Sequence, residues 1–92
     1  METKNIKLLI LQSNLILITE IEEIGADIGE PDCKLVNPFI VKPGRLEGTA
    51  PTLEPWLSDC TSQTIFMIHS DKIITLADPR PTLLEKYQTL TK

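Results

Sequence analysis

The stretch FMIHSDKIITLADPRP, residues 66–81, places two apolar runs on either side of a short polar step, His69-Ser70-Asp71-Lys72. Both runs are strand-sized and rich in β-branched residues, which is typical of buried strands. We therefore predict strands over residues 64–69 and 72–76, joined at Ser70-Asp71. Each strand is apolar on both faces, so a single copy would leave hydrophobic edges exposed. This pattern favours assembly with other chains.

The apolar segment at residues 6–24, IKLLILQSNLILITEIEEI, reads as either a buried helix or two strands. Ser13-Asn14 divides it, and Asn tolerates the left-handed backbone that two-residue hairpin loops require. Downstream, Ile21 alternates with Glu20 and Glu22, as in a strand with one solvated face. A buried helix would have no reason to place Ser-Asn in its middle. We predict an antiparallel hairpin that turns at Ser13-Asn14.

The middle of the chain contains a third strand between two loops. Residues 25–32 hold two glycines and a proline and read as a loop. Residues 33–41, CKLVNPFIV, read as a strand, within which Pro38 demands a bulge or a locally unpaired edge because it lacks an N–H. Residues 42–63 hold three prolines and two glycines, so we expect a long irregular segment with a helical turn around 54–57.

The C-terminal segment has the pattern of a short helix. Thr82 and Glu85 have the spacing of a capping box, and an apolar stripe of helical period follows, formed by Leu83, Leu84, Tyr87 and Leu90. We predict a helix over about residues 82–91. Five short strands and this helix indicate a single all-β domain, a strongly bent small barrel or sandwich.

Composition and residue counts disfavour several classes of function. The chain has 92 residues, of which 41% are hydrophobic and 24% charged, with a net charge of −4 that disfavours non-specific nucleic-acid binding. Cys33 and Cys60 fit neither a disulfide framework nor a CxxC metal pattern, and a single histidine excludes most His-based zinc sites. No nucleophile–base pair or phosphate loop is present, so we predict no enzymatic activity, cofactor or metal. The broken apolar run at 8–18 is too short for a membrane span, and we expect a cytoplasmic protein.

The segment MIHSDKIITL, residues 67–76, resembles the second characteristic motif of the Sm/LSm family. Ile68 and Ile73 match its hydrophobic positions and Asp71 its acidic one, while His69 and Ser70 stand where Arg and Gly are usual. The Hfq branch of the family gives a second register, which is matched by Met67, Ile68, Ile73, Thr75, Arg80 and Pro81. Val36-Asn37 resembles the end of the first Sm motif.

The resemblance implies an all-β fold, a strongly bent five-stranded antiparallel barrel with a short C-terminal helix, assembled as a ring of about five to seven identical subunits. The fourth strand of one copy would pair with the fifth strand of the next through Ile65, Phe66, Met67, Ile68, Ile73, Ile74 and Leu76. It also implies single-stranded RNA binding, in RNA metabolism or regulation. By position, the resemblance implies that Asn37, His69, Ser70 and Asp71 face the ligand. Of these, Asn37, His69 and Ser70 would contact bases, with Lys72 or Arg80 near phosphates.

Several alternatives stay open at the level of sequence. The absent Arg–Gly pair and the acidic balance favour a structural or protein-interaction ring that has lost the RNA site. His69 either stacks on a base or, more commonly for such a residue, bonds to the backbone of its turn. Trp56 is either a binding hot spot or a packing residue. The acidic loop side chains of Asp27, Glu30 and Asp32 match no calcium-loop spacing and read as solvated.

Overall fold

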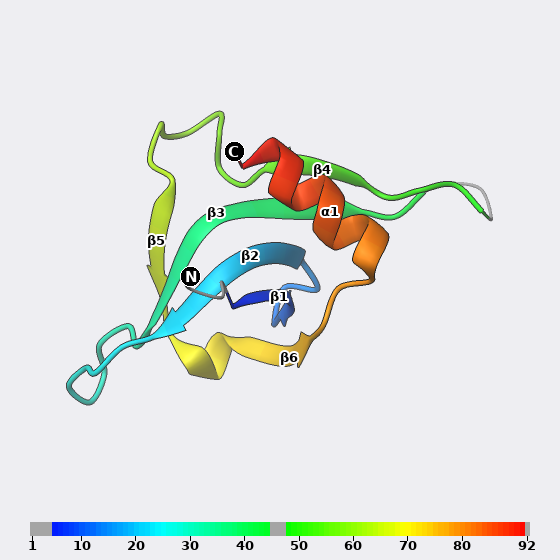
Figure 1. Ribbon diagram of the computed structural model, residues 1–92. Helices are drawn as coiled ribbons and strands as arrows, with labels where there is room; N and C mark the ends of the chain where they lie inside the picture. The colour runs from blue at the N-terminus through cyan, green and yellow to red at the C-terminus, as the bar shows by residue number, and fades with distance from the viewer. Residues whose placement is uncertain (1–4, 45–47, 92) are drawn as a thin grey trace.

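The computed structural model describes residues 5–44 and 48–91, which form six β-strands, one turn of 3₁₀ helix and one α-helix (Figure 1). The sheet is antiparallel throughout, in the order β4-β3-β2-β1-β6, and β5 also pairs with β3. The elements are β1 (Ile6–Leu11), β2 (Ile16–Glu23), β3 (Cys33–Lys42), β4 (Thr52–Pro55), β5 (Ile65–Ile68), η1 (Ser70–Lys72), β6 (Ile73–Ala77) and α1 (Pro81–Leu90).

The predicted N-terminal hairpin is confirmed. β1 and β2 pair antiparallel from Ile6 opposite Glu20 to Ile10 opposite Ile16. Asn14 takes a left-handed conformation with a φ of 68°, and its N–H donates to the Leu11 carbonyl at 2.8 Å. The Ser-Asn step therefore turns the chain as its residue types indicate.

β3 bends sharply and exchanges partners at Pro38. Its residues 33–36 pair with β5, and its residues 39–42 pair with β4. Between the two ladders Asn37 is left-handed, with a φ of 54°, and donates its N–H to the Thr64 carbonyl at 2.7 Å. The missing N–H of Pro38 thus falls where no ladder needs it, and the predicted interruption is confirmed.

The predicted closed barrel of five strands differs from the observed sheet, which has six strands and is not closed. β5 pairs with β3 and β6 with β1, so in the described residues no ladder joins β5 to β6 across η1. The sixth strand, β4, lies inside the segment that we expected to be irregular, and the helical turn predicted at 54–57 is wrong. A four-residue edge strand tolerates Pro51 just before it and Pro55 as its last residue, because one of its edges faces solvent.

Two apolar clusters lie on the two faces of the bent sheet. Neighbouring side chains of a strand point to opposite faces, so Leu17 belongs to one cluster and Ile18 to the other. The cluster of Leu17 is enclosed by the curvature of the sheet, with Trp56 and Phe66 packed against it. The cluster of Ile18 is covered by α1, which crosses the sheet in Figure 1.

The helix α1 is confirmed, with a different start. Pro81 occupies its first turn and Arg80 is the N-cap residue without a side-chain cap, so the expected capping box at Thr82 is wrong. Proline suits this position because its fixed φ is helical and its missing N–H would have no partner there. Leu83 and Leu84 pack against the sheet, while Leu90 remains exposed.

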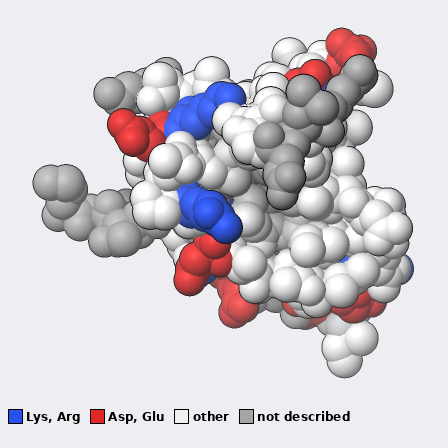
Figure 2. Space-filling model, turned by 90° about the vertical axis from the view of Figure 1, so that its right-hand side faces the viewer, with Lys and Arg blue, Asp and Glu red and all other residues white. Residues whose placement is uncertain are grey.

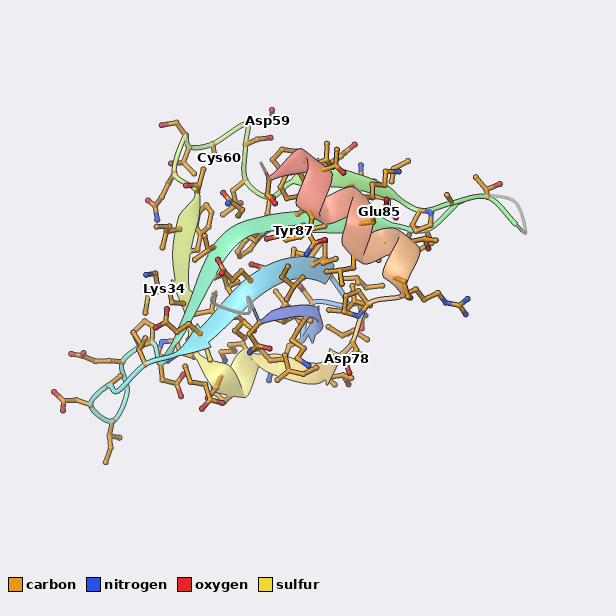
Figure 3. The ribbon with its side chains drawn as sticks, in the orientation of Figure 1. Lys34, Asp59, Cys60, Asp78, Glu85 and Tyr87 are labelled. Carbon is orange, nitrogen blue, oxygen red and sulfur yellow. The ribbon has the colours of Figure 1, made fainter. Side chains whose placement is uncertain are left out.

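Tyr87 joins α1 to an irregular point of the sheet (Figure 3). The β2–β3 register shifts between Ile18 and Glu20, which takes backbone groups out of the regular ladder. The Tyr87 hydroxyl accepts from the Glu20 N–H at 3.1 Å and lies 3.0 Å and 2.9 Å from the Val36 and Asn37 carbonyl oxygens, to which it donates. The ring is buried, and the helix thereby completes hydrogen bonds that the sheet leaves open.

Candidate functional site

Two of the three outer strands, β5 and β6, carry exposed apolar side chains on edges that have no partner strand among the described residues. On β6, Ile74 is 59% exposed and Leu76 is 53% exposed; on β5, Ile65 and Met67 are also exposed. Phe66, Ile68 and Ile73 instead pack against the core cluster of Leu17. The residues predicted for the interface therefore separate into an outward set and an inward set.

The turn η1, between these two strands, is held by a carboxylate from a distant loop. The Asp32 carboxylate accepts from the Ser70 N–H and from the Ser70 hydroxyl, each at 2.7 Å. The hydrogen bonds from Ser70 lower the pKa of Asp32 below its ordinary value. Gln12 adds a second connection, since its N–H donates to the Lys72 carbonyl at 3.0 Å. The turn is thus fixed from two sides.

A shallow hollow of about 290 Å³ lies between this turn and the loop at residues 26–32. His69, Ser70 and Asp71 line it from one side, and Asp27 and Glu30 line it from the other. The exposed Lys72 adjoins them in sequence. The hollow therefore offers an imidazole, a hydroxyl and several carboxylates, a set suited to hydrogen-bond donors more than to phosphates.

Asn37 and Arg80, the other residues predicted to contact RNA, lie elsewhere. Asn37 sits at the bend of β3 and lines a separate hollow of about 320 Å³ with Trp56 and Phe66, whose ring centroids are 5.4 Å apart. Arg80 precedes α1 and lines a third hollow. Of the six residues predicted to contact RNA, only His69, Ser70, Asp71 and Lys72 lie together, at the η1 turn.

Sequence reasoning missed the part played by Asp32, which we interpreted as a solvated loop residue. Its partner Ser70 is 38 positions away, so no local pattern connects the two. The segment after β4 agrees with the packing alternative given above, because Trp56 is half-buried against Phe66. A hydrogen-bonding residue at the end of a loop, next to the start of a strand, was the one available signal for Asp32.

The described residues contain neither a candidate metal site nor a helix that could span a membrane. Across residues 5–44 and 48–91, no group of three or more His, Cys, Asp or Glu side chains is arranged to hold a metal ion. Both thiols are free, Cys33 buried and Cys60 exposed. The helical residues that the structure describes include no stretch with the length and apolar character needed to cross a bilayer.

Comparison with known families covers nearly the whole chain. The profile of DUF6561, a family of unknown function, matches residues 4–92. The chain belongs to this family. No curated protein matches it significantly. The family carries no assigned activity, and the strand edges and the η1 turn are the features of this chain that bear on its function.

Proposed function

We propose that this member of DUF6561 is an Sm-like subunit that assembles with copies of itself into a ring, and that the ring binds single-stranded RNA. The observation that supports assembly best is that the outer edges of β5 and β6 have no partner strand among residues 5–44 and 48–91, and that both carry exposed apolar side chains. β5 of one copy would pair with β6 of the next, and the contact would repeat until about five to seven copies close the ring.

The lengths and chemistry of the two edges support this pairing. β5 has four residues and β6 has five, so one can align along nearly the whole length of the other. Ile65 and Met67 on β5 would cover Ile74 and Leu76 on β6, which removes apolar surface from water on both sides. Exposed, apolar, unprotected edges are otherwise an aggregation hazard, which natural sheets avoid.

The η1 turn supports RNA as the ligand of the ring. It connects the two edges used in assembly, so a ring would repeat His69, Ser70 and Lys72 once per subunit. An imidazole ring can stack on a base, and an ammonium group can neutralise a phosphate. Contacts that are weak in one copy gain strength when a single strand crosses several copies.

The acidic loop supports a second candidate, a ring that works through protein contacts alone. Asp27, Glu30 and Asp71 surround the hollow beside His69, and carboxylates repel phosphates. The opposite side of the molecule, which carries the start of α1 and is drawn in Figure 2, shows Lys and Arg as separate small groups among Asp and Glu. A structural ring would need no continuous basic surface.

Assembly is tested by light scattering on matched variants. We expect Leu76→Lys, on β6, to dissociate the ring to smaller species. Leu90→Lys is the control, because it makes the same change at a leucine of similar exposure on α1, 49% against 53%. The Leu90 variant should keep the mass of the parent. A parent protein that is monomeric at micromolar concentration contradicts the ring.

RNA binding is tested separately by titrating fluorescent oligo-U and oligo-A at two salt concentrations. A specific site should weaken as salt rises, because phosphate contacts release counterions. His69→Ala should weaken binding by about 1–3 kcal/mol if a base stacks on the imidazole. Assembly without binding at tens of micromolar protein in low salt would leave the protein-interaction ring as the better account.

A further inference from the structure

The loop between β2 and β3 presents one apolar side chain on a preformed turn. The Glu30 N–H donates to the Asp27 carbonyl at 3.0 Å, and Gly29, the third residue of this four-residue turn, has a φ of 90°. These features are those of a type II turn, whose third position favours glycine. Ile28, at the second position, is fully exposed, with Asp27 and Glu30 on either side. We call residues 27–30 the Ile28 turn.

A pocket with complementary character lies at the start of α1. Its volume is about 420 Å³, and apolar atoms from Leu8, Pro51 and Leu83 line most of it. Arg80 and Lys86 add two cations to its lining. We call this hollow the α1 pocket. Its shape and composition are those of a binding site, concave and mostly apolar with a few charged groups.

The charges of the α1 pocket are available to an incoming anion. Asp78, the acidic residue in the lining, already pairs with Lys7. Lys86 donates to the Pro51 carbonyl at 3.0 Å, and Arg80 forms no ion pair with any described residue. The first turn of α1 has no acidic residue, so the positive end of the helix dipole is not compensated from within the helix.

We propose that the Ile28 turn of one copy docks into the α1 pocket of a second copy. Ile28 would fill the apolar part of the pocket, while Asp27 and Glu30 would approach Arg80 and Lys86. The turn and α1's first residues lie on opposite sides of the molecule in Figure 1, so a chain cannot fill its own pocket. The contact is therefore head-to-tail between copies. It uses neither β5 nor β6 and so does not depend on the proposed ring.

The test is dilution of the ¹⁵N-labelled full chain carrying Leu76→Lys, so that the β6 edge does not contribute. We expect amide shifts to move with concentration in two places together, the Ile28 turn and the start of α1. Ile28→Ser should weaken this association by about tenfold or more, the effect of losing one buried isoleucine. Leu57→Ser is the control, since it removes another exposed aliphatic side chain.

Mixing two variants gives a stricter check. Labelled Ile28→Ser keeps its pocket, and unlabelled Arg80→Glu keeps its turn. Adding the second to the first should move the pocket amides of the labelled chain and leave its residues 27–30 unmoved. If Leu76→Lys fails to fold, sedimentation of the unmodified chain replaces the dilution, and Ile28→Ser and Arg80→Glu should each lower its concentration-dependent growth by the same amount, leaving any growth due to β5–β6 pairing.

Two results would overturn the proposal. One is the absence of concentration-dependent shifts up to millimolar chain. The other is a pocket whose amides respond to added octanoate but not to more protein, which would assign the site to small anionic amphiphiles. Neither result bears on β5–β6 pairing, because light scattering of the Leu76 and Leu90 variants decides that separately.

Discussion

Replacing Tyr87 with phenylalanine removes one oxygen atom and should destabilise the whole domain. The hydroxyl contacts three backbone groups at 2.9–3.1 Å, and the side chain is only 2% exposed. Its loss leaves the Glu20 N–H without its acceptor and takes a donor from two carbonyls. A buried donor stranded in this way costs about 1–3 kcal/mol. The phenylalanine ring keeps the apolar contacts, including the edge-to-face packing on Phe39.

This cost is measured by urea unfolding of parent and variant at one protein concentration, since assembly also contributes to stability. For a domain of this size, each 1 kcal/mol corresponds to about 4–8 °C in the thermal midpoint. Thr89→Ala is the matched control, because it removes an exposed hydroxyl that bonds to the Glu85 carbonyl on the same helix. A Tyr87→Phe variant as stable as this control would refute the bridging role of the hydroxyl.

Three further outcomes are expected. Burial raises the pKa of Tyr87, so the free energy of unfolding that the protonated hydroxyl contributes is complete below pH 10 and is lost as the pH rises further. Absorbance of the phenolate follows this titration directly, because the chain has a single tyrosine. The lowered pKa of Asp32 gives the opposite pH dependence: the ionised carboxylate contributes to the free energy of unfolding above pH 4, and this contribution is lost on acidification. Ser70→Ala removes a hydrogen bond to that carboxylate and should reduce the loss in acid-unfolding curves. Gly29→Ala should destabilise by about 1 kcal/mol because of its positive φ, whereas Gly25→Ala should be neutral in the same denaturation assay, since neither strain nor a neighbour opposes a Cβ there.

The features that sequence predicted well are local. Asn14 turns the hairpin and Pro38 interrupts β3 because of properties that each residue carries alone, a tolerated left-handed backbone and a missing N–H. The helix follows from the spacing of leucines around Tyr87. In each case the physical cause lies within a few residues of its effect.

The features that sequence missed are contacts between distant segments. The strand β4 exists because β3 offers it an edge, which overrides the irregular appearance of a proline-rich stretch. Tyr87 was placed correctly on an apolar helical stripe, but its hydroxyl serves a register shift that no periodicity reveals. The group of RNA-contact candidates was only partly assembled by the fold, because Asn37 lies at a bend and Arg80 at a helix start.

The change of partners along β3 has an evolutionary consequence. β4 and β5 bond to different halves of one strand, so neither depends on the other for its ladder. Insertions or deletions between them can accumulate without shifting the register of either. Selection can therefore alter the β4 hairpin and the segment that follows it while the β5–η1–β6 unit stays constant. We expect length variation within DUF6561 to concentrate between these two strands.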